Sequence, residues 1–363
     1  MYKIYLKILA VIAISGTLIA APEGGRLSTG FVFQKWTIEN VTNPVSEGSF
    51  PIELIYPFMD NLQVQVSHLP ALSQFGESNL AGLSDTWIRT SYSLMNNQLA
   101  LSLGVGLPTG KTELDSTEIL ITQLISQNSF KFRLPVFGQG LTLSGGVMYA
   151  LPVNDLFTVG IGANYVYRGQ YKFSKLSPFE YDPGDQIGGN IGFDYSINPS
   201  LTASLDCVYS YYLADKLDKT EVFTSGPNFT IKLFTQYKLD FGDLWLNAFY
   251  RAKSRNETWD GQALAPEAKN SNVTLREVEL GSRIRLNEIV FINVLTELRT
   301  YAKNEYDTGS ITIFGGGIGY DLSVTRNFAL SMGIKLFFGN GEFFNTTPSL
   351  TGNEFYFGTQ WYF

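Results

Sequence analysis

Histidine and cysteine are nearly missing from this sequence of 363 residues, which holds one of each. A single cysteine, Cys207, excludes an intramolecular disulfide framework, and one His with one Cys far apart cannot build a typical zinc site. A Ser–His or Asp–His hydrolase needs an imidazole as its base. His68 shares an apolar register with Leu62, Val64 and Val66, which favours a place at the outer rim of a strand over a catalytic role. The sequence therefore predicts a protein that is not an enzyme and that has no cofactor or metal.

Charged residues are also scarce, at 16% of the chain, and the formal net charge is −7. This acidic balance argues against nucleic acid as a partner. Apart from the N-terminus, no apolar run approaches the roughly 20 residues that a transmembrane helix needs. If the chain crosses a membrane, it must therefore cross with strands, and scarce charge fits strands that turn one face to lipid.

The N-terminus has the features of a secretory signal peptide. A short basic region precedes an apolar run at 8–14, and small residues surround a cleavage site after Ala20. A retained anchor helix is the alternative, but the apolar run is shorter than a membrane span. We therefore expect residues 1–20 to be a cleaved signal peptide.

The last ten residues, Glu354 to Phe363, form an alternating strand that is unusual for a soluble protein. Phe355, Phe357, Trp361 and the terminal Phe363 fall on one face. An exposed strand face with this much aromatic surface would promote aggregation in water. In an outer-membrane barrel, that face contacts lipid and both strand edges are paired. Such terminal strands also resemble the signal by which outer-membrane proteins are recognised for assembly, so the barrel-assembly machinery is an expected partner through the strand ending at Phe363.

Alternating segments also repeat along the rest of the chain. Leu99, Leu101 and Leu103, for example, alternate with small residues. This period of two indicates strands rather than helices. Sixteen such segments can be counted, and fourteen is the alternative because the first segment and the one near 310, with Ile311 and Ile313 on its inner face, have irregular patterns. The segments are 32–40, 50–57, 61–69, 84–94, 98–107, 139–152, 156–168, 185–197, 200–213, 228–240, 243–254, 274–286, 288–302, 310–322, 327–338 and 354–363.

The connections between these segments alternate in length. Tight turns rich in Asn, Asp, Gly and Pro alternate with longer polar loops, among them 41–48, 70–83 and 108–138. Outer-membrane barrels show this alternation, with short periplasmic turns and longer extracellular loops, whereas a soluble β-sandwich or propeller does not require it. The sequence thus predicts an all-β chain in the outer membrane of a Gram-negative bacterium. A short periplasmic segment at 21–30 would precede a transmembrane antiparallel β-barrel at 31–363.

If the apolar face of each strand contacts lipid, the opposite face lines the lumen. Charge on this face is concentrated after about residue 228. Opposed Arg and Glu side chains either neutralise each other and hold the wall rigid, or set a field that selects solutes, as charged rings do in channels. The first interpretation is favoured for any single residue, and a slip of one residue would invert the set of any strand. The expected pore-lining residues are Asp85, Trp87, Arg89, Arg168, Lys232, Gln236, Lys238, Arg251, Lys253, Glu277, Glu279, Arg283, Arg285, Glu297 and Arg299.

The segment 108–138 has the most features of its own. Asp115 or Ser116 can cap a short helix with Glu118 in its first turn and apolar residues on one side. Loops of this length usually have a function or are disordered. Two arrangements remain open, an inward-folded constriction or lid and a further pair of strands that projects outside.

Three stretches in order, 50–67, 82–92 and 101–110, resemble the outer-membrane transporters of the phenol-degradation meta-pathway type. The most specific elements are Gly-Leu-Ser-Asp at 82–85 and Leu-Pro-Thr-Gly at 107–110. That family is related to the long-chain fatty-acid and toluene transporter barrels. The resemblance implies a channel for passive uptake of small hydrophobic or aromatic compounds across the outer membrane.

Two features of the fatty-acid transporters are not found in this sequence. Residues 21–29 are too few for their helical N-terminal hatch. No Asn-Pro-Ala kink lies near the third strand, where Pro70 follows Leu69, so a side gate is not supported. A general or charge-selective porin with a water-filled lumen is therefore the alternative function. Outer-membrane lipid and small-molecule solutes are the expected partners in both cases.

Overall fold

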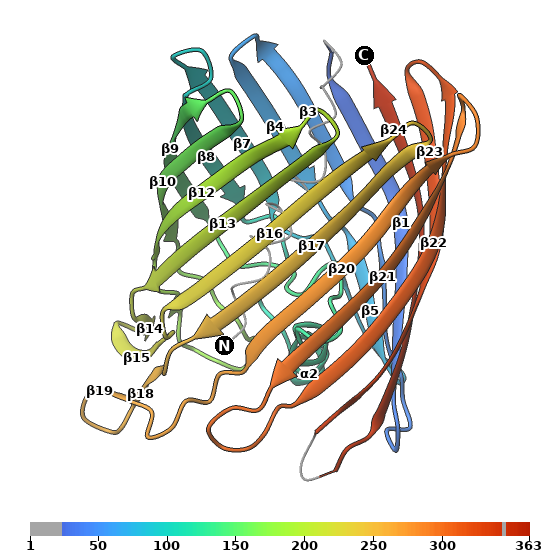
Figure 1. Cartoon of the computed structure of the whole chain (residues 1–363). Coiled ribbons are helices and arrows are strands. Elements are labelled where there is room, and N and C mark those ends of the chain that lie inside the picture. The colour runs from blue at the N-terminus through green and yellow to red at the C-terminus, as the bar shows by residue number, and fades with distance from the viewer. Residues whose placement is uncertain (1–23, 343–345) are drawn as a thin grey trace.

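The computed structural model describes residues 24–342 and 346–363, which form a closed antiparallel β-barrel (Figure 1). The sheet has 19 strand segments, and these make sixteen wall strands because three wall strands consist of two segments each. Sixteen was the larger of the two expected numbers and is confirmed. The expected signal peptide lies outside the described residues. In the described ranges, no helix is both long enough and apolar enough to cross a membrane.

The wall strands follow one another around the barrel in chain order. The second wall strand consists of β2 and β3, the third of β4 and β5, and the fourth of β6 and β7. The segments are β1 (Arg26–Ile38), β2 (Val45–Ser49), β3 (Ile52–Met59), β4 (Leu62–His68), β5 (Ala71–Phe75), β6 (Ser78–Gly82), β7 (Thr86–Leu94), β8 (Leu99–Leu107), β9 (Thr142–Asn154), β10 (Phe157–Arg168), β12 (Gln186–Asn198), β13 (Leu201–Tyr212), β16 (Asn228–Leu239), β17 (Gly242–Lys253), β20 (Thr274–Arg285), β21 (Val290–Ala302), β22 (Ile311–Thr325), β23 (Phe328–Gly341) and β24 (Ser349–Tyr362).

The barrel closes between its first and last strands. β24 pairs with β23 on one edge and with β1 on the other, where the register runs from Arg26 opposite Tyr362 to Ile38 opposite Leu350. Phe357 and Trp361 are exposed on the outward face, as the terminal pattern predicts. Because both edges are paired, the aromatic strand offers no free edge for aggregation.

Large apolar side chains cover the outside of the wall. Leu103, Ile161, Phe314 and Phe338 are more than half exposed, and each comes from a different strand. Since side chains alternate between the two faces of a strand, their neighbours point into the lumen. An apolar outside with a polar inside is the pattern of a transmembrane β-barrel, and the predicted alternation is confirmed.

The first four wall strands differ from expectation at their ends. β1 begins at Arg26, inside the expected 21–30 segment. The predicted loop at 70–83 is wrong, because β5 and β6 form a hairpin there around Gly76, whose φ of +62° suits glycine. The predicted loop at 41–48 is also too long, because β2 starts at Val45. The strand pattern was missed here because these strands face a packed interior rather than water.

Prolines interrupt two of the split strands without opening the wall. Pro51 separates β2 from β3, and Pro70 separates β4 from β5, since proline has no N–H for the ladder. Hydrogen bonds still cross the interruptions, from Phe50 N to Pro70 O at 2.9 Å and from Ser84 N to Leu69 O at 3.2 Å. The backbone of the third strand is therefore kinked but paired on both sides.

Connections of two lengths alternate around the barrel, as predicted. Two-residue turns such as 60–61 and 240–241 lie at the short-turn end, whereas most connections at the other, long-loop end are longer. Over that end, three of the loops pair into a second, small sheet. Its strands are β11 (Tyr181–Asp182), β14 (Asp215–Leu217), β15 (Thr220–Thr224), β18 (Glu257–Trp259) and β19 (Leu264–Pro266).

The connection between β8 and β9 does not project outside but folds into the barrel. We call residues 108–141 the internal segment; it contains the helix α2 (Ser116–Ile125), seen inside the wall in Figure 1. Asp115 caps this helix, and its carboxylate and the Glu118 side chain bond reciprocally to each other's backbone N–H groups. The predicted helix and its cap are confirmed; of the two arrangements left open, the structure has the inward fold and not the external strand pair.

Candidate functional site: the lumen and its internal segment

Both ends of the internal segment are tied to one aspartate of the wall. Asp85 lies between β6 and β7, in the fourth wall strand. Its Oδ1 accepts a hydrogen bond from Gly110 N at 2.9 Å, and its Oδ2 accepts one from Gln139 N at 2.7 Å. Hydrogen bonds to an ionised acceptor are stronger than neutral ones. Asp85, expected to line the pore, thus clamps the two ends of the segment together.

The middle of the internal segment is bound to the opposite wall. Lys131 forms an ion pair with Glu277 on β20. On β21, Arg299 Nη1 donates to Ser129 O at 2.7 Å, and Tyr301 OH donates to Asn128 O at 2.8 Å. β20 and β21 are the twelfth and thirteenth of sixteen wall strands, so they lie about half a circumference from the fourth strand. The segment therefore crosses the lumen.

A third set of contacts binds the segment to the closing seam of the barrel. Gln34 on β1 donates through Nε2 to Lys131 O at 3.2 Å and accepts from Arg133 N at 3.1 Å. Trp36 Nε1 donates to Phe130 O at 3.0 Å. On β2, Glu47 Oε1 accepts from Leu134 N at 2.9 Å. These bonds satisfy four backbone groups of a segment that forms no sheet, as buried backbone requires.

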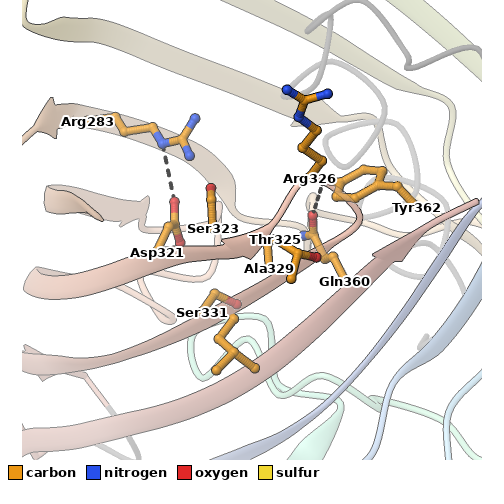
Figure 2. Close-up of a pocket in the computed structure, with 10 residues that line it drawn as sticks. Arg283, Asp321, Ser323, Thr325, Arg326, Ala329, Ser331, Gln360 and Tyr362 are labelled. Carbon is orange, nitrogen blue, oxygen red and sulfur yellow. Dashed lines mark hydrogen bonds and ion pairs between the residues drawn. The ribbon is translucent and has the colours of Figure 1, made fainter. Parts of the chain in front are cut away.

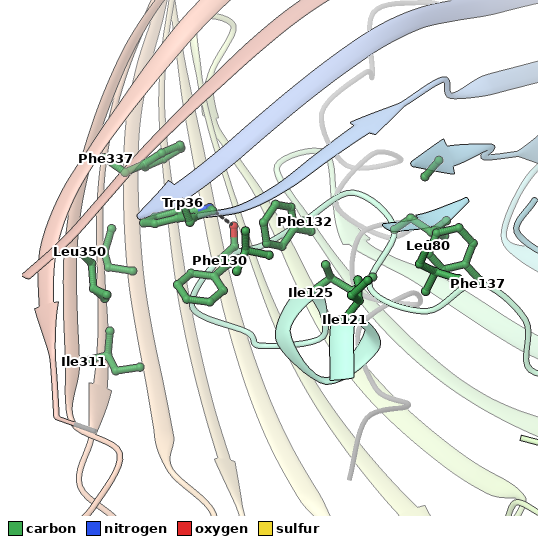
Figure 3. Packing of buried hydrophobic residues seen from close by; sticks show 14 of the residues in the cluster. Trp36, Leu80, Ile121, Ile125, Phe130, Phe132, Phe137, Ile311, Phe337 and Leu350 are labelled. Atoms are coloured by element: carbon green, nitrogen blue, oxygen red, sulfur yellow. Dashed lines mark hydrogen bonds between the residues drawn. The ribbon is translucent and has the colours of Figure 1, made fainter. Parts of the chain in front are cut away.

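Apolar packing completes this anchorage. Trp36 lies between Phe337, on which it stacks, and Phe130, whose ring is tilted by 36°, and both centroid separations are 5.2 Å (Figure 3). Ile313 and Leu350 belong to the same buried cluster. Full burial of such a side chain contributes about 1.5–3 kcal/mol. The cluster explains the irregular inner face near residue 310, because Ile311 and Ile313 face the internal segment rather than water.

Arg299 joins the polar and apolar parts of the contact. Only 1% of its side chain is exposed, and its Nε lies 2.8 Å from Oε1 of Glu297, which is 6% exposed. The guanidinium also lies over the rings of Trp36 and Phe337, at 5.8 and 5.2 Å from their centroids. Glu297 and Arg299 are two residues apart on β21, so they neutralise each other within one strand rather than across neighbouring strands.

Charge also positions the helix α2 within the lumen. Its Glu118 forms ion pairs with Lys111 and with Lys175 of the loop that follows β10. Partial burial opposes ionisation of Glu118, but the hydrogen bonds from Lys111 and from the Asp115 N–H outweigh it and lower the pKa of the carboxyl. Glu118 therefore carries its negative charge at neutral pH and holds both lysines.

The strand registers place the predicted pore-lining residues on the inward face. Arg89 lies over the Trp87 ring at 4.6 Å, and Arg168 donates to Gly184 O and to Gln186. Whether these residues line a conducting path stays a prediction. The others on this face are Lys232, Gln236 and Lys238 on β16, Arg251 and Lys253 on β17, Glu277, Glu279, Arg283 and Arg285 on β20, and Glu297 and Arg299 on β21.

One group of carboxylates in the described residues is close enough to share a metal ion. Glu277, Glu279 and Glu297 each offer an oxygen within 4.8 Å of the others. Two of the three carboxylates have cationic partners, since Lys131 pairs with Glu277 and Arg299 with Glu297. Asn247 donates to Glu279 at 3.0 Å. The group is part of the internal segment's anchorage.

A small cavity lies at the short-turn end between β20, β22, β23 and β24 (Figure 2). Its volume is about 150 Å³, and polar side chains line most of it. Arg283 Nε lies 3.2 Å from Asp321 Oδ2 at its edge, and the guanidinium covers the Phe291 ring at 4.0 Å. The predicted residue Arg283 is thus held by a carboxylate and a ring at the short-turn mouth.

The wall from β9 to β12 carries small inward-facing residues. The amide oxygen of Asn164 occupies the space that a Cβ on Gly188 would fill. The amide oxygen of Asn190 likewise occupies the space that a Cβ on Gly162 would fill. Because the amides lie along the wall, they make it polar without narrowing the lumen. We call this part of the wall, from β9 to β12, the low-relief wall.

No protein-family model matches this sequence, and no curated protein matches it. Solved structures share its fold. The high-pH structure of OprB from Pseudomonas putida has a TM-score of 0.52 at 9% identity, covering 93% of this chain and 94% of that one. The deltaS2 mutant of the TodX monoaromatic hydrocarbon channel has a TM-score of 0.50 at 8% identity, covering 94% and 91%. The expected likeness to toluene-transporter barrels is thus confirmed at the level of the fold.

Proposed function

We propose that this protein is an outer-membrane channel for the passive uptake of small, mainly hydrophobic or aromatic compounds. The observation that carries the proposal is the internal segment, which crosses the lumen from Asp85 to Glu277 and Arg299. A sixteen-stranded wall alone commonly leaves a wide aqueous pore. A segment fixed on both sides narrows that pore, and a narrow passage lets contacts with the wall discriminate between solutes.

Two further observations support this function. The fold is shared with TodX, which is described as a monoaromatic hydrocarbon channel. His68 faces outward, opposite Ile52, and its Nδ1 lies 3.0 Å from Thr86 Oγ1. In this register the imidazole faces away from the lumen, where a solute would pass. We therefore assign the protein no catalytic role.

A porin with a water-filled lumen is the second candidate. The low-relief wall of Gly, Ser and Asn residues along β9, β10 and β12 favours it, because small polar side chains leave room for water. The two functions differ in how freely ions pass beside the internal segment.

Single-channel conductance in planar bilayers separates the two candidates. The wild type is compared with a variant lacking residues 112–136, in which Asp85, Gly110 and Gln139 remain. We expect a small wild-type conductance that rises on deletion because the lumen is cleared. Uptake of toluene and phenol into proteoliposomes is measured in parallel. A large, steady wild-type conductance that the deletion leaves unchanged contradicts the proposal and favours the porin.

Assembly of the barrel gives the terminal strand a separate role. The outward aromatic face of β24, ending at Phe363, supports recognition by the barrel-assembly machinery. Replacing Phe363 with Ser is expected to lower the amount of folded barrel in the outer membrane. The test is heat-modifiable gel mobility of membrane fractions.

A further inference from the structure

Inward-facing charges are distributed unevenly around the lumen. On the side where the internal segment is anchored, ion pairs neutralise many of them, among them Lys131–Glu277, Arg133–Glu354 and Arg299–Glu297. The adjoining strands β16 and β17, next to β20, differ. Among the described residues, no carboxylate oxygen lies within 4.0 Å of the cationic groups of Arg168, Lys232, Lys238 or Lys253. Arg168 on β10 is separated from the lysines by β12 and β13, which carry Asp194 and Asp206, so the basic part of the wall is β16 and β17.

The three lysines follow the height of the lumen on two adjacent strands. Lys253 is the last residue of β17, at the long-loop end, and Lys238 is near the end of β16, at the short-turn end. Lys232 lies between them. Asp243 is directly opposite Lys238, and it accepts a hydrogen bond from Gln236 at 3.4 Å. An anion that enters the barrel can thus meet a cation at each level.

Lys232 has both charge and aromatic surface around it. Phe249 is its direct neighbour on β17, and Phe234 is two residues further along β16 on the same face. Asp206 is opposite on β13, but its Oδ1 lies 2.7 Å from the position of a Cβ on Gly192, which belongs to the next strand, β12. Asp206 therefore forms no close ion pair with Lys232, although its charge still acts on the ammonium group.

We propose that Lys232, Phe234 and Phe249 form a binding stripe for aromatic carboxylates that pass through the lumen. An ammonium group binds a carboxylate through charge-assisted hydrogen bonds, and the two rings offer surface for edge or offset contact with an aromatic ring. All three side chains are partly exposed to the lumen, and Phe249 also packs against the buried cluster of the internal segment beside Glu277 of β20. The inference rests on the proposed channel function and names the class of solute that the channel favours.

Reversal potentials across planar bilayers test this inference. The full-length protein is measured in gradients of potassium chloride, potassium acetate and potassium benzoate, so that a simple anion preference is separated from an aromatic one. We expect anions to be preferred over potassium and benzoate over acetate. Lys232→Gln should lower the permeability of both carboxylates about two- to fivefold, the effect of losing one exposed ion pair. Phe234→Leu should lower the benzoate-to-acetate ratio and leave the acetate-to-chloride ratio unchanged.

Lys35→Gln makes the same chemical change on the outward face of β1 and is expected to alter no permeability ratio. A wild type that prefers potassium, or a Lys232→Gln variant with wild-type ratios, overturns the stripe but leaves the channel in place. If Phe234→Leu changes the permeabilities of benzoate and acetate equally, the rings do not contribute to binding and only the lysine part of the proposal stands. A wild type that passes neither ions nor solutes contradicts the channel function itself.

Discussion

Replacing Arg299 with Met tests how the internal segment is held in the lumen. The substitution keeps a long apolar side chain against Trp36 and Phe337 but removes the donor to Ser129 O and the partner of Glu297. Stranding one member of a buried ion pair costs about 3–5 kcal/mol. Loss of the donor to a buried carbonyl adds about 1–3 kcal/mol. The second cost falls on the contact between the segment and β21, whereas the first falls within β21, which carries both Glu297 and Arg299.

We expect Arg299→Met to loosen the segment and raise both the conductance and its fluctuations in planar bilayers, while the barrel itself still folds. A double variant, Glu297→Gln with Arg299→Met, removes the stranded charge as well. It should regain thermal stability but not the anchorage, so its conductance should stay high. Arg283→Met is the matched control, since Arg283 pairs with Asp321 at the short-turn end. If Arg299→Met conducts like this control, the anchoring role of Arg299 is refuted.

Three further predictions concern the helix, the wall and the rim. The pKa of Glu118 is lowered in the folded state, so its stabilisation of α2 is complete above its usual pKa of 4.5 and is lost as the pH falls through the lowered pKa. Protease cleavage within 111–125 should therefore rise at acidic pH in the wild type. In Glu118→Gln the cleavage rate should not change with pH in this way. Gly188→Ala should turn Asn164 into the lumen and reduce conductance, whereas Gly189→Ala, whose Cβ meets its nearest atom at 3.9 Å, should not. His68→Ala should leave solute uptake by proteoliposomes unchanged, and a loss of uptake with normal folding would contradict its assignment to the outer rim.

The wall was predictable from sequence because lipid imposes a simple pattern on it. Most outward positions of a strand are apolar, so Leu99, Leu101 and Leu103 reveal both the strand and its register. The charged inward residues follow from the same alternation. The strand ends at 45–49 and 71–82 were not predicted because their inward side chains pack against other residues instead of facing water. Pro51 and Pro70 also interrupt the alternation of apolar and polar residues there.

The site itself was only partly predictable. The helix at 116–125 could be inferred from its capping residue. The residues of that segment do not, however, indicate which wall strands it contacts. Trp36, Gln34 and Glu47 were missed as anchors, although one signal was present: large apolar residues on the inner face, Trp36 and Ile313, mark wall that something covers. Large apolar residues on the inner face of a barrel strand can therefore indicate where an internal segment packs against the wall.

The contacts of the internal segment also have a consequence for the order of folding. Its hydrogen bonds and ion pairs join residues 97, 146, 170 and 221 positions apart in the chain. They involve β1 and β24 together, which become neighbours only when the ends of the sheet meet. Contacts of such separation form late because the intervening chain must be ordered first. The lumen therefore narrows only after the barrel has closed, and protection of the segment from protease reports completed assembly.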